Sequence, residues 1–332
     1  MNVVSALAAV VILLGIGLAG GSSGGMQFLF GIVIPYLAVL VFTVGILWRV
    51  LKWAKSPVPF RIPTTCGQQT GLPWIKPDTL EAPHTGLQVA KRMFLEVFLF
   101  RSLFRNTRTK LHEGNAVYGS TKWLWLAGLA FHYAFFTILI RHLRFFLNPV
   151  PGAIAALESA DGFLQIGLPQ LYQTDIVILA ALGFLFARRL LEPAVRYISL
   201  ASDYFPLFLI GAIATTGILM RYFIRVDVAG IKQLGMGLAT FAPQVPAGMS
   251  PLFFAHLFLV SALLAYFPLS KLVHAPGVFL SPTRNLANNS RQVRHVNPWN
   301  PTVKFHTYDE WEEEFHVALK NSGFPLDHEY KE

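Results

Sequence analysis

The composition of the chain argues against a soluble globular protein. Of its 332 residues, 54% are hydrophobic and only 14% are charged, whereas soluble domains average about 45–50% apolar and about 25% charged residues. A single cysteine can neither build a disulfide framework nor supply all ligands of an iron–sulfur cluster or structural zinc site, so any such cluster would belong to a partner. The net charge of +9 would suit nucleic-acid binding, but in so apolar a chain basic residues usually flank membrane spans.

Six stretches are long and apolar enough to cross a membrane as helices, which takes roughly 20 residues. The first carries no Lys or Arg and no convincing cleavage site, so a removed signal peptide is the weaker interpretation of it. We therefore predict an all-α integral membrane protein with six transmembrane helices. These lie at about residues 3–20, 27–51, 121–147, 169–191, 203–223 and 251–274.

The distribution of Lys and Arg predicts the orientation in the membrane. The polar stretch between spans two and three is strongly basic, which places it in the cytoplasm. Alternation then puts both termini in the cytoplasm and 22 of the 27 Lys and Arg residues on the inner side. The outer connection 148–170 contains neither Lys nor Arg. We expect a multi-pass protein of the cytoplasmic (inner) membrane, in contact with lipid and not with nucleic acid.

The predicted spans divide the chain into four segments. These are an N-terminal two-span hairpin (1–51), a cytoplasmic loop (52–120), a membrane domain with four spans (121–275) and a cytoplasmic tail (276–332). Within 84–112, apolar residues recur among charges at a spacing typical of an amphipathic helix on the membrane surface or against a partner. They are Leu87, Phe94, Leu95, Phe98 and Leu99.

The tail contains one short amphipathic helix by the same criteria. Thr307 stands three residues before Glu310, the spacing of a capping box, and Trp311, Phe315 and Leu319 follow at intervals of four. A single apolar stripe with polar, Pro-rich flanks gives the tail little core of its own. We expect the tail to dock on another subunit; the alternative is that it folds back on the cytoplasmic loop.

Four of the ten histidines lie within or at the ends of predicted spans, His132 and His142 on span three and His256 and His274 on span six. Ionisable groups at membrane depth are costly and usually functional, although one alone is more often a packing residue. Spans three and six run in opposite directions. His142 is therefore expected opposite His256 near the outer face, and His132 opposite His274 toward the cytoplasm.

The spacing along each span constrains these pairs further. At 1.5 Å per residue, the two histidines are about 15 Å apart along span three and about 27 Å apart along span six, so tilt must absorb the difference. Eighteen residues are five helical turns, which predicts His256 and His274 on one helix face. Pro268 is where span six could bend.

Two imidazoles from facing helices form the axial ligand set of a low-spin b-type haem, a cofactor that transfers electrons. Small residues next to His132, such as Ala127, Gly128 and Ala134, would leave room for a flat macrocycle. Zinc or di-iron sites fit less well, because the spans supply no carboxylate near the histidines and one ion cannot bridge both pairs. Four arginines near the outer face are candidates for haem propionates, or for lipid phosphates to which they would snorkel. They are Arg141, Arg144, Arg221 and Arg225.

This histidine pattern resembles that of a known family. The pair ten apart in GLAFHYAFFTILIRH, and the pair eighteen apart that ends in FPLSKLVH, together look like the haem-ligand pattern of the cytochrome b (gamma) subunit of respiratory nitrate reductase. The resemblance covers about residues 121–285 and implies a four- or five-helix haem bundle, here with an extra N-terminal helix. RIPTTCGQQ at 61–69 and the tail sequence TYDEWEEEFHVALKNSGFPLD resemble DsrM-type membrane subunits of sulfite-reduction-associated Dsr complexes. Cytochrome b subunits of membrane heterodisulfide reductases are more distantly similar.

The resemblance implies cofactors and partners. Two haems b would be held by His132 with His274 (proximal, cytoplasmic side) and by His142 with His256 (distal, outer side), and menaquinone would exchange electrons near the distal haem. The proximal haem would face a cytoplasmic iron–sulfur subunit resembling the catalytic subunit of heterodisulfide reductase, a DsrK-like protein. A periplasmic multihaem cytochrome c, an iron–sulfur protein and a second quinone-interacting membrane subunit would lie nearby. The partner's substrate would be the sulfur carrier DsrC in its trisulfide state.

A quinol site would need a cavity near the distal haem and a group that accepts protons. Candidates near the outer face are Tyr172, Gln173, Asp175, Arg225 and Asp227, although Asp175 can also simply cap span four. Cys66 in the cytoplasmic loop is either a packed interface thiol, which we favour, or a redox-active or cluster-contacting one.

The sequence thus predicts an electron-transfer subunit of a quinol-linked oxidoreductase, with the sulfur chemistry on its partner. It would relay electrons from menaquinol at the outer face to the cytoplasmic iron–sulfur subunit in dissimilatory sulfur metabolism. Two alternatives stay open. One is a gamma subunit of a nitrate reductase or another quinone-linked enzyme; the other is a non-redox membrane anchor or a proton or metal transporter.

Overall fold

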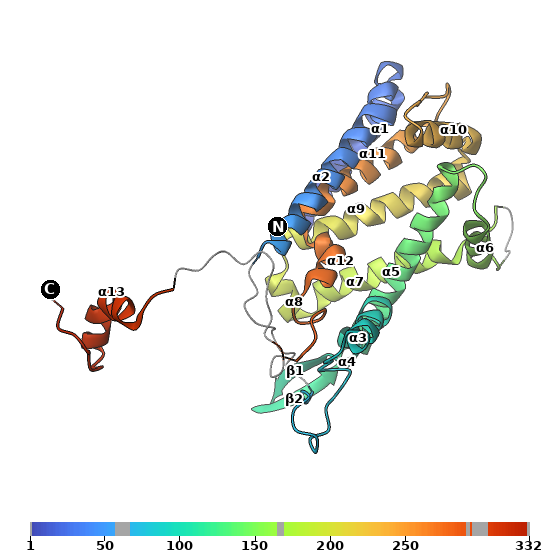
Figure 1. Cartoon of the computed structure of the whole chain (residues 1–332). Coiled ribbons are helices and arrows are strands. Elements are labelled where there is room, and N and C mark those ends of the chain that lie inside the picture. The colour runs from blue at the N-terminus through green and yellow to red at the C-terminus, as the bar shows by residue number, and fades with distance from the viewer. Residues whose placement is uncertain (1, 57–66, 165–168, 290–292, 294–304, 331–332) are drawn as a thin grey trace.

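The computed structural model describes residues 2–56, 67–164, 169–289, 293 and 305–330. Long helices form a bundle, and one two-stranded sheet lies beyond its end (Figure 1). The expectation of a mostly helical membrane protein is confirmed. Cys66 and the first part of RIPTTCGQQ fall outside the described residues.

Five helical stretches of the described chain are long and apolar enough to cross a membrane. They are Asn2–Ser22, Gly24–Ala54, Lys122–Phe145, Ala201–Ile224 and Pro251–Leu269. The first is helix α1 (Asn2–Ser22), and the second consists of η1 (Gly24–Met26), η2 (Leu29–Val33) and α2 (Ile34–Ala54). The other three consist of α5 (Lys122–His142) with η3 (Leu143–Phe145), α9 (Ala201–Ile218) with η4 (Leu219–Ile224), and α11 (Pro251–Tyr266) with η5 (Phe267–Leu269). Helix α7 (Gln173–Leu191) lies where the fourth span is predicted. It carries Asp175, Arg188 and Arg189 near its ends and is not among the five. A total of six spans, with α7 as one of them, therefore stays a prediction.

The long helices pack side by side in a defined order. Helix α5 contacts α7, α7 contacts α9, and α9 and α11 both contact α1. The buried residues between them are almost all apolar, such as Ile178 between α5, α7 and α9, and Leu209 and Leu259 between α9, α11 and α1. The N-terminal helix α1 is therefore an integral part of the bundle and not an appendage to it.

Glycines allow the first two helices to approach the helical stretch 251–269 closely. A Cβ atom on Gly17 would lie 2.7 Å from Cα of Ala255, and one on Gly45 would lie 2.6 Å from the ring of Pro268. Small residues at such contacts are typical of helix pairs in membranes, where close backbone packing replaces the hydrophobic effect as the force that holds helices together.

The predicted sixth span, 251–274, is broken and not merely bent. Helix α11 ends at Tyr266 and η5 at Leu269; Ser270 is extended, and its hydroxyl accepts a hydrogen bond from the backbone N–H of Leu272. The chain then continues as η6 (Lys271–Val273), α12 (His274–Gly277) and η7 (Val278–Leu280). The expectation that His256 and His274 share one face of a continuous helix is therefore wrong, because Pro268 and the cap at Ser270 end the helix first.

Two further helices lie at the end of the bundle where spans three and four are joined and where spans five and six are joined (Figure 1). They are α6 (Gly152–Asp161) and α10 (Val228–Ala239), which Asp227 caps by accepting a hydrogen bond from the N–H of Ala229. The sequence patterns did not indicate either helix. Both are short, and α6 is rich in small residues without a strong apolar stripe.

The opposite end carries the segment that joins spans two and three. Its amphipathic helix is α3 (Gly86–Leu99), capped by Thr85, and it is followed by α4 (Arg101–Arg105). An antiparallel hairpin of β1 (Thr107–His112) and β2 (Asn115–Ser120) comes next, and its Glu113–Gly114 turn has positive φ at both positions. This hairpin, which we did not predict, is the sheet of the described chain. Helix α8 (Pro193–Ile198) lies at the same end (Figure 1).

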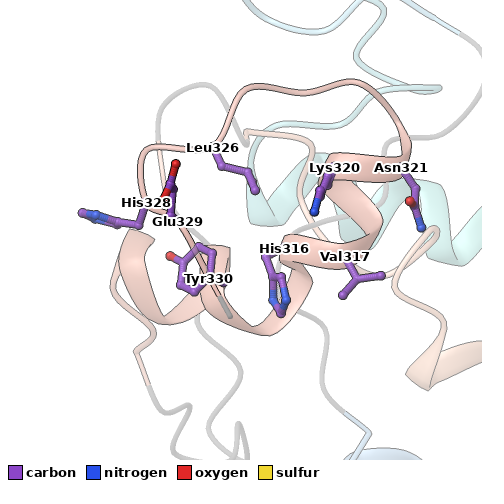
Figure 2. A pocket seen from close by; sticks show the side chains of 8 residues that line it. All are labelled: His316, Val317, Lys320, Asn321, Leu326, His328, Glu329 and Tyr330. Carbon is purple, nitrogen blue, oxygen red and sulfur yellow. The ribbon is translucent and has the colours of Figure 1, made fainter. Parts of the chain in front are cut away.

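The tail contains α13 (Tyr308–Asn321), which begins with the predicted capping box of Thr307 and Glu310. Residues that follow the helix fold back over it, as Figure 2 shows for Tyr330 near His316. The carboxylate of Glu312 is fully buried under this turn and accepts hydrogen bonds from the N–H groups of Asp327 (2.7 Å) and His328 (3.1 Å) and from the hydroxyl of Tyr330 (2.9 Å).

These contacts change the acidity of both partners. Burial opposes ionisation of Glu312, but the hydrogen bonds from Asp327, Tyr330 and His328 outweigh it and hold the pKa of Glu312 below its usual 4.5. Burial and the bond to Glu312 raise the pKa of Tyr330 to about 12. The tail is thus a small folded unit built around one buried carboxylate.

Candidate functional site

The four membrane histidines come together as two pairs. The ring centroids of His142 and His256 lie 6.4 Å apart with their planes inclined by 15°, and those of His132 and His274 lie 5.9 Å apart with planes inclined by 85°. Helix α5 supplies one member of each pair. The other members come from α11 and from the first residue of α12.

Every one of these imidazoles has its Nδ1 atom in a hydrogen bond. Nδ1 lies 2.7 Å from the carbonyl oxygen of Gly128 in His132, 2.7 Å from that of Ile138 in His142, 3.0 Å from that of Lys271 in His274 and 2.9 Å from Oγ1 of Thr216 in His256. A carbonyl oxygen can only accept, so the proton of the first three rings sits on Nδ1. In the neutral form of each ring, Nε2 is then unprotonated and able to bind a metal.

Thr216 imposes the same tautomer on His256. Its hydroxyl lies 2.8 Å from the carbonyl oxygen of Ala212 and 3.0 Å from that of Ile213, to which it donates, so it accepts from Nδ1 of His256. A hydrogen bond of this kind to the nitrogen remote from the metal fixes both the tautomer and the orientation of a metal-binding histidine. Thr216 is buried on α9.

The ring separations fit a metal ion held between two imidazoles. Two metal–nitrogen bonds of about 2 Å each, plus about 1.2 Å from each nitrogen to its ring centre, separate the centroids by about 6 to 6.5 Å. Both observed separations lie within a few tenths of an ångström of this range. Among the described residues, no three His, Cys, Asp or Glu side chains converge as they would around a bare metal ion. The donor set therefore fits the axial ligands of a haem better than a zinc or di-iron centre.

Aromatic rings surround the pair at the α3 end of the bundle. Phe100, Phe131 and His274 each present an edge or a face to the imidazole of His132 at centroid distances of 5.0, 5.0 and 5.9 Å. Phe100 lies at the junction of α3 and α4 with φ of 49°, an uncommon value for a bulky residue. Of the small residues expected near the haems, Ala134 is buried between α5 and its neighbours.

Three of the four arginines expected near the outer face, Arg141, Arg144 and Arg221, lie in a polar network beside His142. Arg141 is buried and pairs with Asp161 (3.1 Å) and Asp175 (3.6 Å). Arg144 pairs with Glu158. These carboxylates come from α6 and from the start of α7, and they already compensate two of the charges that we expected to meet haem propionates or lipid phosphates.

Tyr172, a quinol-site candidate, lies at the centre of this network. Its ring lies between the guanidinium groups of Arg141 and Arg221, whose Cζ atoms are 3.6 and 3.8 Å from the ring centroid. Its hydroxyl bonds to Glu158. Such cation–π contacts are strongest where water is excluded.

Of the other quinol-site candidates, Asp175 belongs to this network, whereas Gln173, Arg225 and Asp227 lie outside it. Tyr222 donates to Asp175 (2.8 Å) and accepts from the N–H of Tyr172 (3.0 Å). Gln173 bonds to the carbonyl oxygen of Ala160 (3.3 Å) at the exposed start of α7. Arg225 is exposed at the end of η4 with φ of 52°, and Asp227 caps α10, so neither joins the network around Tyr172.

Sequence reasoning missed several residues of this site. Thr216, Glu158, Asp161 and Tyr222 are all polar groups in or next to membrane helices, and that burial cost was the signal that could have identified them. Phe100 offers no such signal, because its position against His132 depends on the elbow between α3 and α4.

The fold and the site together define a multi-pass helical membrane protein with two facing imidazole pairs. Residues 92–295 match the family described as nitrate reductase gamma subunit. The chain is 46% identical over 280 residues to a protein of Archaeoglobus fulgidus named Hdr-like menaquinol oxidoreductase cytochrome b-like subunit, which covers 82% of this chain and 84% of that protein. It is 42% identical over 275 residues to a protein of the same name from Archaeoglobus profundus, covering 81% of this chain and 82% of that one. The chain belongs to the nitrate reductase gamma-subunit family, which confirms the resemblance inferred from the histidine spacing.

Proposed function

We propose that this chain is the dihaem cytochrome b subunit of a quinol-linked membrane oxidoreductase. The observation that carries the proposal is the pairing of four imidazoles at metal-binding separation, each with Nδ1 engaged. His132 with His274 would hold one haem b, and His142 with His256 the other. Haem b with two imidazole ligands supplies reversible one-electron transfer and leaves no open site for oxygen.

The quinone is proposed from the relatives. Both are named menaquinol oxidoreductase subunits, which supports menaquinol as the electron donor. The network of Arg141, Tyr172, Asp175 and Tyr222 lies beside His142 and offers hydroxyl and carboxylate groups that can hold and pass protons. We propose the menaquinol site there, near the outer face, with Asp175 as the first candidate for accepting a proton.

The direction across the membrane follows from charge. The basic residues of 52–120 and of the tail favour the cytoplasm for the α3 end of the bundle and for both termini, which supports a position of the His142 pair toward the outside of the inner membrane. Protons released outside while electrons move inward would separate charge. The four segments 1–51, 52–120, 121–275 and 276–332 keep their proposed roles, with the tail as a docking element.

The proposed partner is a cytoplasmic iron–sulfur subunit of the heterodisulfide-reductase type. The names of the relatives contain the term Hdr-like, and the single cysteine of this chain leaves any cluster to another subunit. Reduction of a DsrC trisulfide in sulfite or sulfate metabolism is the finer proposal. A periplasmic cytochrome c, an iron–sulfur protein and a second membrane subunit are further candidates for the complex.

A pyridine haemochrome assay on the complex purified in detergent tests the proposal first. We expect two haems b per chain after any c-type haem of a partner is counted separately. Mass spectrometry of the same sample identifies the partners, and a co-purifying molybdenum enzyme would instead favour a nitrate-reductase-type complex. Absence of haem b from an intact preparation would overturn the redox function and return attention to a non-redox anchor or transporter.

A further inference from the structure

Helix α3 turns its charged face toward the protein and its apolar face outward, the reverse of a helix on the surface of a water-soluble protein. Its two central charged residues, Arg92 and Glu96, are only 4% and 5% exposed. Its large apolar side chains face outward: Leu87, Phe94 and Phe98 are 82%, 57% and 50% exposed. A helix that buries its charges and presents its phenylalanines requires an apolar environment on its outer side.

The buried charges hold α3 in this orientation. Glu96 accepts hydrogen bonds from Arg284 (2.9 Å) and from the N–H of Ser102 (3.1 Å). Arg92 donates to the carbonyl oxygen of Glu81 (3.1 Å), whose carboxylate pairs with Arg101. Rotating α3 to turn its phenylalanines inward would break these buried pairs, which is strongly destabilising.

The C-terminal end of α3 lies beside α5 (Figure 1). The carbonyl oxygen of Phe98 accepts a hydrogen bond from the hydroxyl of Tyr133 (3.0 Å), and that of Leu99 accepts one from the indole N–H of Trp125 (2.7 Å). Tyr133 stands eleven residues after Lys122, the first residue of α5, which is about 16 Å along the helix axis. Its side chain points back toward the start of α5, and Trp125 stands only three residues after Lys122, so α3 ends within two to three turns of the start of that span.

The hydrogen bonds at this end of α3 suit a lipid environment. The last carbonyl groups of a helix have no partner within the helix and normally bond to water. Here side chains of α5 bond to the carbonyl oxygens of Phe98 and Leu99. The hydroxyl of Thr121 donates to those of Leu103 and Asn106 at the end of α4 (3.4 and 2.8 Å). Non-helical backbone is tolerated at membrane depth only where such partners are provided.

The exposed face of α3 continues the exposed apolar face of α5. Leu126, Phe136 and Leu139 are exposed on α5, a helix that is apolar enough to cross the membrane and mostly uncovered by protein. Lys91 lies exposed on the same face of α3 as Phe94, nearer the polar end, where an ammonium group can reach phosphate headgroups. A protein surface that covered Phe94 and Phe98 would have to displace lipid from the neighbouring side of α5.

We propose that α3 and α4 form a re-entrant element that enters the leaflet on the Lys122 side of the bundle, with Phe94 and Phe98 in contact with lipid acyl chains. The element enters and leaves the membrane from the same side. Phe100, at the junction of α3 and α4, contacts His132 of α5, and the buried charged face of α3 packs against Glu81 and Arg284.

Photo-crosslinking with lipid tests this placement on the purified complex in nanodiscs. The bilayer contains a phosphatidylcholine whose acyl chain carries a diazirine. Trypsin cleaves after Arg92 and Arg101, so the peptide 93–101 reports on α3 alone. The peptide 111–122 from the β-hairpin is the aqueous control, and the peptide 123–141 from α5 is the lipid-exposed control.

We expect lipid adducts on 93–101 at a level similar to that on 123–141 and at least several-fold above that on 111–122. The proposal is overturned if 93–101 carries no more adduct than 111–122 while 123–141 is labelled. A second measurement places p-benzoylphenylalanine at position 94, with position 111 as the matched exposed control. Capture of lipid at position 94 supports the proposal, and capture of a co-purifying polypeptide there in place of lipid contradicts it.

Discussion

The hydroxyl group of Thr216 lies 2.9 Å from Nδ1 of His256 and connects helix α9 to the candidate haem ligand on α11. The same hydroxyl donates to backbone carbonyl groups of its own helix, so its lone pair is oriented toward the imidazole. The ring of His256 is thereby held by a helix that contributes no ligand. The affinity and the midpoint potential of a haem bound at His256 would therefore report on this contact.

Replacing Thr216 with valine removes the acceptor and keeps the shape of the side chain. Loss of such a partner typically weakens metal binding roughly 10- to 100-fold, and a less electron-rich imidazole favours the reduced iron. We therefore expect haem bound at His256 to dissociate more readily and its midpoint potential to rise in a redox titration. Thr215→Val is the matched control, since Thr215 is exposed on the same helix; equal effects of both variants would contradict this role.

The two histidine pairs should be distinguishable by electron paramagnetic resonance of the oxidised protein. Nearly parallel imidazole planes, as in His142 and His256 at 15°, would split the d orbitals of a haem iron held between them and give a rhombic low-spin signal. Nearly perpendicular planes, as in His132 and His274 at 85°, would leave those orbitals close in energy and give a strongly anisotropic signal.

Ligand variants then assign the two signals. We expect His142→Ala to lower the haem b content from two to one per chain and to remove the rhombic signal alone. His274→Ala should remove the strongly anisotropic one. His316→Ala, in the tail, is the control and should change neither. Retention of two haems b in both ligand variants would refute the assignment.

Arg141 is expected to be a major determinant of stability near the His142 pair. Removing one partner of a buried ion pair leaves an uncompensated charge and costs about 3–5 kcal/mol, and Arg141 faces two carboxylates, Asp161 and Asp175. Arg141→Ala should therefore lower the thermal unfolding temperature in detergent by several degrees. Arg225→Ala removes an exposed arginine and should have little effect. An unfolding temperature unchanged by Arg141→Ala would show that the pairs contribute nothing.

Gly17 should be intolerant of any side chain. Because a Cβ atom there would lie 2.7 Å from Cα of Ala255, Gly17→Val would force α1 away from α11 and cost about 1–3 kcal/mol through overpacking. Gly15→Val makes the same change two residues earlier, where nothing lies within 4 Å. Thermal unfolding of both variants measures the difference, and equal stability would mean that α1 does not pack on α11 in the membrane.

The fold of the tail should depend on pH through Glu312. Its pKa is lower in the folded tail than in an unfolded one, so its contribution to stability is present above about pH 4.5 and is lost as the pH falls through the lower, folded-state pKa. We expect Glu312→Gln to speed amide hydrogen exchange at Asp327 and His328 at pH 7, and the difference from the wild type to shrink below pH 4. Glu313→Gln, on an exposed neighbour, should exchange like the wild type at both pH values.

The sequence predicted the parts of this molecule that follow from local periodicity. Hydropathy located the long helices. The antiparallel course of spans three and six predicted that His132 faces His274 and that His142 faces His256, as the ring contacts show. The capping box at Thr307 was equally local. Each of these features depends on residues within a few turns of one another, which is the range over which a helix imposes its repeat.

Features that depend on contacts between distant segments could not be predicted in this way. The acidic partners of Arg141 and Arg144 lie on α6 and at the start of α7, and no spacing rule links them to α5. Helix α3 was recognised as amphipathic, but which of its faces is buried is decided by Arg284, which is 188 residues from Glu96. The polar hairpin 107–120 lacks the apolar alternation that would have indicated strands.

The break after η5 makes helix α2 structurally necessary for the His132 pair. His274 does not continue α11, so its position depends on how the segment around Pro268 is held. Arg49 donates to the carbonyl oxygen of Pro268 (3.2 Å), Gly45 lies against the proline ring, and Phe42 packs on Phe267 at 5.5 Å. All three belong to α2. A shortened chain that kept all four histidines but began at the third span would therefore lose the support that positions His274.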